Sequence, residues 1–180
     1  MLNSSIILIG MPGSGKTTIG KTVASMCGIG FVDTDELLQK ELGMTLQEYI
    51  DKFGPEGFAG EEEKFLCTLE RPQTPQVIAT GGSAILYSDA VEHLKSIGTL
   101  VFIDCDLPQL KKRIWNFESR GIVLAAGQNR EQALLDLYSE REPMYYKYCD
   151  VRIEQGNRGR RSIANSVIKG VEEYEAGTRI

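Results

Sequence analysis

A lysine and a threonine near the start of the chain close a glycine-rich stretch whose spacing suits phosphate binding. Residues 10–17 fit the pattern G-x-x-x-x-G-K-[ST]; in order they are Gly10, Met11, Pro12, Gly13, Ser14, Gly15, Lys16 and Thr17. Glycine admits backbone conformations that a Cβ atom blocks, so successive N–H groups can turn inward around an anion. Lys16 would bring a charge to the β- and γ-phosphates, and the Thr17 hydroxyl would bind Mg²⁺. The stretch therefore predicts a nucleotide-binding site that runs from Gly10 to Thr18.

The segments on either side of this stretch have the patterns that a phosphate-binding loop requires. The apolar run of residues 6–9 predicts a fully buried strand. Residues 18–27 form a helical pattern, and a helix that follows the loop would point its positive N-terminal end at the phosphates. Because all fixed positions and both flanks agree, we favour nucleotide binding over a chance glycine-rich turn.

Apolar runs and helical patterns alternate along the rest of the chain. Strands are predicted at residues 6–9, 31–32, 76–80, 100–104 and 151–153, and helical patterns separate them. This alternation predicts the α/β class: a three-layer P-loop fold with a five-stranded parallel sheet and helices on both faces. Ligands bind such sheets at the carboxyl ends of the strands, which is where Asp33, Asp35, Gly81 and Gly82 fall.

Several segments between the strands carry specific expectations. Thr45 and Glu48 have the spacing of a capping box, and Gly54-Pro55 should break the helix that they begin. The acidic run of residues 61–63 is interpreted as a solvated helix face, because adjacent helix positions do not point the same way. Residues 120–129 lack clear periodicity and are predicted as a mobile loop. Residues 130–148 are predicted as a long helix that is interrupted near Pro143.

The composition is that of a globular protein and argues against several classes of partner. The 180 residues suffice for a single domain spanning 1–180, and the net charge of −5 lacks the basic excess typical of nucleic-acid binding. No apolar run approaches the length of a membrane span. The four cysteines form no C-x-x-C pair and the chain has one histidine, which argues against a zinc site. We therefore expect a cytoplasmic protein with free thiols and with no nucleic-acid or membrane partner.

Taken together, these residues resemble the shikimate kinase family, which is similar to the nucleoside-monophosphate kinases. The match covers nearly the whole chain: the phosphate loop, Asp33-Thr34-Asp35, the Gly81-Gly82 turn, an arginine-bearing lid at about 116–130, and Arg141-Glu142-Pro143-Met144-Tyr145 for the family's R-x-P-L-Y segment. The resemblance implies a monomer, ATP and Mg²⁺ as cofactors, and an acceptor-binding helical segment at about 35–70. It implies transfer of the ATP γ-phosphate to a hydroxyl of shikimate, a step of chorismate and aromatic amino acid biosynthesis.

The resemblance also implies a role for each residue that matches a family motif. Lys16, Asp35 and Arg120 would act in catalysis, with Asp35 orienting the acceptor hydroxyl and Arg120 covering the phosphates. Thr17 and Asp33 would hold Mg²⁺, Asp33 through water. A carboxylate suits both tasks, because Mg²⁺ prefers oxygen ligands and a hydroxyl nucleophile needs a hydrogen-bond acceptor. The alternative for Asp35 is that it caps the helix that follows, which would explain one aspartate but not two.

Further residues would bind the two substrates. The contacts to ATP outside the phosphate loop would come from Arg113, Arg120, Asn157 and Arg158. The acceptor site would include Asp35, Ala59, Gly81, Gly82, Ser83 and Arg141. Arg113 would stack on adenine, or else lie on a solvated face beside two lysines. Arg141 would hold the acceptor's carboxylate as a bidentate fork, or else form a surface ion pair with a neighbouring glutamate.

The chain departs from the family pattern in the acceptor half of the site. The family's G-E-x-x-F-R pattern falls on residues 54–59, where the arginine is replaced by Ala59, and the third glycine of G-G-G is Ser83. Loss of a charged partner for a carboxylate weakens substrate binding. An alternative acceptor, such as homoserine, gluconate or a nucleoside monophosphate, therefore stays open. So does a nucleotide-binding regulatory protein without catalysis. A nucleoside monophosphate is disfavoured, because residues 45–70 contain no arginine to hold its phosphate.

Overall fold

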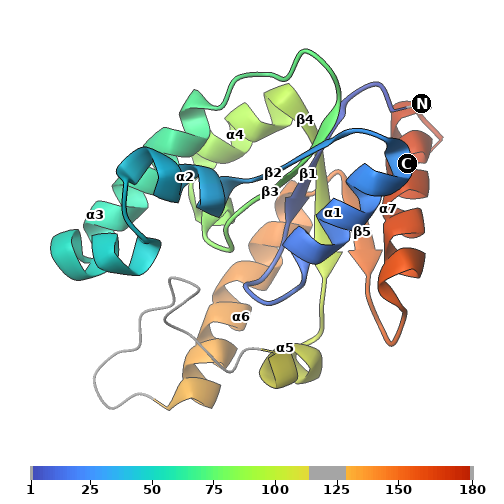
Figure 1. Ribbon diagram of the computed structural model, residues 1–180. Coiled ribbons are helices and arrows are strands. Elements are labelled where there is room, and N and C mark those ends of the chain that lie inside the picture. The colour runs from blue at the N-terminus through green and yellow to red at the C-terminus, as the bar shows by residue number, and fades with distance from the viewer. Residues whose placement is uncertain (1, 114–128, 179–180) are drawn as a thin grey trace.

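A five-stranded parallel sheet forms the centre of the protein in the computed structural model, which describes residues 2–113 and 129–178 (Figure 1). The strands lie in the order β2-β3-β1-β4-β5, and every neighbouring pair is parallel. Their bounds are β1 Ser5–Ile9, β2 Gly30–Asp33, β3 Gln76–Ala79, β4 Gly98–Asp104 and β5 Val151–Glu154. The predicted α/β class with a five-stranded parallel sheet is confirmed.

Helices connect the strands and cover both faces of the sheet (Figure 1). Their bounds are α1 Lys16–Cys27, α2 Thr34–Leu42, α3 Leu46–Thr68, the short 3₁₀ helix η1 Ala84–Leu86, α4 Ser88–Ile97, α5 Leu107–Arg113, α6 Arg130–Tyr148 and α7 Arg160–Glu175. Within the two described ranges, no helix is both long and apolar enough to cross a membrane.

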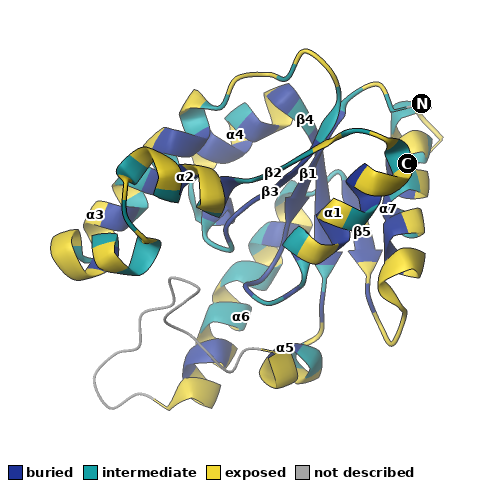
Figure 2. Cartoon of the chain, viewed as in Figure 1, coloured by how far each residue is buried: buried dark blue, intermediate teal, exposed yellow. Residues whose placement is uncertain are grey.

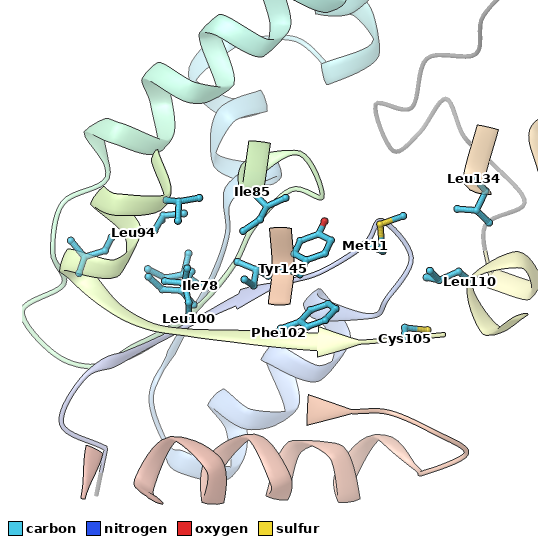
Figure 3. Close-up of a cluster of buried hydrophobic side chains, with 14 of the residues drawn as sticks. Met11, Ile78, Ile85, Leu94, Leu100, Phe102, Cys105, Leu110, Leu134 and Tyr145 are labelled. Carbon is cyan, nitrogen blue, oxygen red and sulfur yellow. The ribbon is translucent and has the colours of Figure 1, made fainter. Parts of the chain in front are cut away.

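Successive strand residues point to opposite faces of the sheet and build two separate cores. On one face, Ile6 and Leu8 of β1 pack with residues of α1 and α7. On the other face, Ile7 and Ile9 pack with residues of α4, α5 and α6. Figure 2 shows the resulting pattern, with the strands β1, β3 and β4 mostly buried and with exposed residues on the outer sides of the helices. Figure 3 shows the second core, in which Tyr145 lies beside Phe102.

Helices α2 and α3 form a smaller cluster with η1 and α4. The predicted capping box begins α3: the Thr45 hydroxyl accepts from the Glu48 N–H, and the Glu48 carboxylate accepts from the Thr45 N–H. Gly54 breaks the helical geometry with φ 78° and ψ 167°, as the Gly54-Pro55 pair predicts. After this kink the helix turns Phe58 and its successors toward the cluster.

Two of the helical predictions are wrong. Helix α6 runs without interruption from Arg130 to Tyr148 with Pro143 inside it, so the expected break is absent from this described segment. The acidic run of residues 61–63 is not wholly solvated, because Glu62 is only 4% exposed. The predicted mobile loop at 120–129 lies outside the described residues apart from Asn129, whose side chain caps α6.

Candidate functional site

A cleft of 660 Å³ opens where the carboxyl ends of the strands meet. The residues that line it come from the loops after β1, β2, β3 and β5, together with the end of α5. Twelve of the residues predicted from the sequence to form the site line this cleft: Pro12, Gly13, Ser14, Gly15, Lys16, Thr17, Thr18, Asp33, Asp35, Gly82, Arg113 and Arg158. The fold therefore brings the predicted phosphate, metal and nucleotide residues to one place.

The loop after β1 has the conformation that its glycines predict. Gly10, Gly13 and Gly15 all have positive φ, and a Cβ at Gly10 would lie 2.8 Å from the carbonyl oxygen of Ile103. Lys16 is buried, and its Nζ donates to the carbonyl oxygens of Gly10 at 2.7 Å and Met11 at 3.1 Å. Because Gly15 is the N-cap of α1, the positive end of this helix faces the cleft beside the ammonium group.

Asp33 connects this loop to the acidic segment after β2. One carboxylate oxygen accepts from the Thr17 hydroxyl at 2.8 Å, and the other accepts from the Asp35 N–H at 3.1 Å. Asp33 is thus the N-cap of α2, and the alternative that Asp35 caps this helix is wrong. The Thr17 and Asp33 oxygens suit Mg²⁺, which usually binds one or two protein oxygens together with phosphates and water. The described residues contain no cluster of three or more acidic, histidine or cysteine ligands that could hold a metal without such help.

The Asp35 carboxyl lies in the same cleft, in the first turn of α2. Its pKa is raised to about 7, mainly by burial and in addition by the negative charges of Glu62 and Asp33, while Lys16 opposes the shift. A carboxyl group with a pKa near neutrality can accept a proton from a hydroxyl more readily than an ordinary aspartate. Asp35 therefore has the position and the basicity of a general base.

Glu62 of α3 is a site residue that the sequence analysis missed. The Ser83 hydroxyl donates to its carboxylate, with the hydroxyl oxygen 2.6 and 2.9 Å from the two carboxylate oxygens, and the Tyr87 hydroxyl donates to it at 2.8 Å. Burial raises its pKa, although these hydroxyls and the charge of Arg141 act in the opposite direction. A signal was present in the sequence, because Glu62 falls four residues after Phe58 and three before Phe65, on the apolar face of the helix.

Gly81 lies beside both carboxylates, at a position where a larger residue would not fit. A Cβ at this position would lie 2.6 Å from Glu62 Oε1 and 2.8 Å from Asp35 Oδ1. The Gly81 N–H donates to the buried Thr34 hydroxyl at 3.3 Å, which fixes the turn against the start of α2. The predicted acceptor residues Gly81 and Ser83 thus lie beside Glu62, and Gly81 also faces Asp35.

Gly82, the next residue of the turn, packs against the phosphate loop. A Cβ there would lie 2.5 Å from the Pro12 ring, so only glycine allows this approach. The Gly82 carbonyl accepts a hydrogen bond of 2.7 Å from the hydroxyl of Tyr145, which is buried in the core beneath. This turn therefore joins the phosphate loop to the acceptor residues.

Arg141 extends from α6 toward the same acceptor residues. It is near enough to Glu62 and Tyr145 for its positive charge to act against the rise in the pKa of both groups. Its contact with Glu140 is long, at 4.0 Å, and its buried Nε has no hydrogen-bond partner among the described residues. Glu142 accepts instead from the Tyr138 hydroxyl. These contacts favour an anion-binding role for Arg141 over a surface ion pair.

The remaining predicted residues divide into those near the cleft and those outside it. Ala59 is half-buried on α3, one turn before Glu62. Arg113 at the end of α5 and Arg158 after β5 line the cleft, whereas the exposed Asn157 does not. Arg120 and nearly all of the predicted lid at 116–130 lie outside the described residues. The roles of all these residues stay predictions.

Comparison with known proteins agrees with this geometry. The family model for shikimate kinase matches residues 12–172. A shikimate kinase from Thermodesulfovibrio yellowstonii is 33% identical over 173 residues, which cover 96% of this chain and 98% of that protein. The solved structure of a shikimate kinase from Acinetobacter baumannii in complex with shikimate aligns with a TM-score of 0.84 at 27% identity, over 99% of this chain and 96% of that one.

A more distant neighbour shares the fold alone. A gluconokinase from Sinorhizobium meliloti aligns with a TM-score of 0.58 at 18% identity, over 98% of this chain and 95% of that chain. The sequence and structural matches to shikimate kinases are much stronger. They support an enzyme and leave the alternative of a regulatory protein without catalysis unsupported. The protein is an ATP-dependent small-molecule kinase, and it belongs to the shikimate kinase family.

Proposed function

We propose that this protein transfers the γ-phosphoryl group of ATP to a hydroxyl of shikimate. The observation that carries the proposal is that Asp35 lines the same cleft as Lys16 and Thr17, while Arg141 acts on Glu62 of the acceptor side and has a buried Nε without a hydrogen-bond partner among the described residues. Asp35 would therefore bind the acceptor hydroxyl, Lys16 and Thr17 the phosphates of the donor, and Arg141 the acceptor carboxylate. The solved relative from Acinetobacter baumannii, which is a complex with shikimate, supports this choice of acceptor.

The nucleotide half of the reaction depends on fixed positive charge. In this proposal the N–H groups of the loop, the N-terminus of α1 and the Lys16 ammonium surround the β- and γ-phosphates. These groups stabilise charge that spreads over the phosphoryl oxygens during transfer, and they need little reorganisation because the loop is rigid. Arg120 would add a further positive charge to the phosphates, as the sequence predicts.

The acceptor half of the reaction depends on Asp35. Its carboxylate would accept a hydrogen bond from the acceptor hydroxyl, orient the oxygen for in-line attack and take its proton as the new bond forms. Arg141 would bind the acceptor carboxylate. Glu62, held by the Ser83 and Tyr87 hydroxyls, would face other hydroxyls of the acceptor. The segment 35–70 would thus supply much of the acceptor site.

Mg²⁺ fits the oxygen pair of Thr17 and Asp33. A bound Mg²⁺ would neutralise phosphate charge and orient the nucleotide. The hydrogen bond between the Thr17 hydroxyl and the Asp33 carboxylate holds these two oxygens beside the phosphate loop. We expect no turnover when a chelator removes divalent cations, and full recovery when Mg²⁺ is returned.

Ala59 stands where the family pattern has an arginine, so the identity of the acceptor is the part of the proposal that most needs a test. We would measure ADP release with ATP and Mg²⁺, and compare shikimate with gluconate and homoserine. Turnover with shikimate and none with the other two supports the proposal, whereas turnover with another acceptor alone refutes it. The variant Ala59→Arg returns a cation one turn from Glu62 and should lower the KM for shikimate. Gly60→Arg places the same charge on the neighbouring exposed position and serves as the control.

A further inference from the structure

Gln155 is a buried polar residue that none of the predicted roles includes. It follows β5 directly, is only 1% exposed and lines the cleft. Its backbone N–H donates to the Asp104 carbonyl at 2.9 Å, which extends the pairing of β5 with β4 by one residue. The main chain therefore holds Gln155 rigidly, and its side chain has a defined direction.

Both the nitrogen and the oxygen of the Gln155 side-chain amide form hydrogen bonds. The amide nitrogen donates to the carbonyl oxygen of Ser14, in the phosphate loop. The amide oxygen accepts from Nη1 of Arg113 at 2.9 Å. A buried amide that has one donor and one acceptor contact is expensive to replace, because an apolar side chain would leave the Ser14 carbonyl without this donor and would remove one contact of the Arg113 guanidinium. Gln155 thus bridges two parts of the cleft that are about one hundred residues apart in sequence.

The contacts of Arg113 fix the plane of its guanidinium group. Nη1 donates to Gln155 and also to the Cys105 sulfur at 3.4 Å, and Nη2 donates to the side-chain oxygen of Gln109 at 3.2 Å. Gln109 in turn donates to the Gly156 carbonyl at 2.7 Å, in the loop after β5. Guanidinium hydrogen bonds lie in the plane of the group, so two such contacts orient the plane while its flat faces stay available for stacking.

We propose that Gln155 is a positioning residue for the nucleotide base, which holds the Arg113 guanidinium in a fixed place relative to the phosphate loop. ATP would span this bridge, with its phosphates in the loop that contains Ser14 and its base against Arg113. ATP can then contact the phosphate loop and Arg113 at the same time only if the distance between these two parts of the cleft is kept. The inference rests on the proposed function in that the ligand is ATP, and on the sequence prediction that Arg113 contacts the base; it requires no particular acceptor.

The test measures binding without any acceptor, so its failure is distinct from a failure of turnover with shikimate. Titration calorimetry would compare ATP with inorganic tripolyphosphate, which fills the phosphate loop but has no base. In Gln155→Met, which keeps the length and removes both hydrogen bonds, we expect ATP to bind about tenfold more weakly, the effect of losing roughly 1.4 kcal/mol. The affinity of this variant for tripolyphosphate should change by less than about twofold. Gln132→Met, an exposed glutamine on α6, should leave both unchanged.

A double-mutant cycle separates positioning from a general structural role. If Gln155 acts through Arg113, Gln155→Met should cost ATP binding much less when Arg113 is already alanine. Equal losses for ATP and tripolyphosphate, or full additivity in the cycle, would overturn the proposal. If Gln155→Met does not fold, Gln109→Met removes the second in-plane contact of Arg113 from a half-buried position. It should weaken ATP binding while sparing tripolyphosphate, and an unchanged affinity for ATP would refute the idea.

Discussion

Two carboxylates on either side of one glycine determine the character of the acceptor site. Asp35 and Glu62 come from different helices, and each would lie within 3 Å of a Cβ at Gly81. Their mutual repulsion helps to hold the pKa of Asp35 near 7, and the hydroxyls of Ser83 and Tyr87 keep Glu62 in place. The site therefore combines a base of suitable strength with a second, fixed carboxylate, and each can be tested by a single isosteric change.

We predict that Asp35→Asn reduces kcat by roughly two to three orders of magnitude, because an amide cannot take a proton from the acceptor hydroxyl. The KM for ATP should stay within about twofold, since Asp33 and the phosphate loop are unchanged. Steady-state kinetics with both substrates varied would measure this. Glu36→Gln, on the exposed side of the same helix turn, is the control and should retain full activity. A similar loss in both variants would argue against a specific role for Asp35.

The pH dependence should follow from the raised pKa of Asp35. Ionised Asp35 is the active form, so kcat/KM for the acceptor should fall as pH drops through about 7. In Glu62→Gln a negative charge beside Asp35 is lost. The pKa of Asp35 should then decrease, and the acid limb of the profile should move to lower pH. Glu63→Gln, its half-buried neighbour, should leave the limb in place. An unmoved limb in Glu62→Gln would show that Glu62 carries no charge there.

The sequence predicts contiguous site residues well and residues assembled by packing poorly. The phosphate loop is one continuous stretch whose residue types follow from local backbone geometry, so its place could be predicted without a structure. Glu62 depends on Ser83 and Tyr87, which are 21 and 25 residues away, and Gln155 depends on Ser14, which is 141 residues away. Such contacts arise from the order of the strands, which a single sequence does not state.

At the scale of elements, the kink in α3 brings Glu62 into the site. Gly54 has φ 78° and ψ 167°, a conformation that other residues adopt only with strain. The sequence predicted this break because glycine followed by proline disfavours a continuous helix. It predicted the interruption at Pro143 by the same rule and was wrong there. A proline removes one hydrogen bond, and the tertiary packing of α6 against β4 and η1 outweighs that loss.

Two alanine substitutions in α3 should have opposite effects on stability. Gly54→Ala forces a Cβ into a positive-φ position and should lower the free energy of unfolding by roughly 1–3 kcal/mol. Gly60→Ala lies in regular helix with nothing within 4 Å of the added Cβ, so it should raise the free energy of unfolding by about 0.5–1 kcal/mol. Urea denaturation of both variants would measure the difference. A loss in Gly60→Ala would mean that the exposed face of α3 has contacts that the structure lacks.

At the scale of the whole molecule, the core and the two halves of the site meet at one residue. Tyr145 of α6 stacks on Phe102 of β4 with ring centroids 4.9 Å apart, and its hydroxyl donates to the Gly82 carbonyl (Figure 3). Gly82 itself packs against Pro12 of the phosphate loop. A change in the core at this point should therefore affect both stability and the acceptor turn.

We predict that Tyr145→Phe keeps the stacked ring but leaves the Gly82 carbonyl without its partner. The free energy of unfolding should fall by roughly 1–3 kcal/mol, the cost of an unsatisfied buried group. The KM for the acceptor should rise, because the turn that carries Gly81 and Ser83 loses its support. Tyr146→Phe is the matched control. Its exposed hydroxyl donates to Asp104 at 3.2 Å, so its effect on stability should be within about 0.5 kcal/mol.

Measuring both the free energy of unfolding and the acceptor KM of Tyr145→Phe shows whether the hydrogen bond to Gly82 supports the acceptor site or only stabilises the fold. Thermal or urea unfolding measures the stability of the variant. Acceptor titrations well below the melting temperature measure the KM for the acceptor. A fall in stability with an unchanged acceptor KM would show that the hydrogen bond to Gly82 serves only the core. A rise in acceptor KM with an unchanged KM for ATP would show that Tyr145 acts through the turn of residues 81–83. The phosphate loop, held by its own glycines and by Lys16, would then be independent of it.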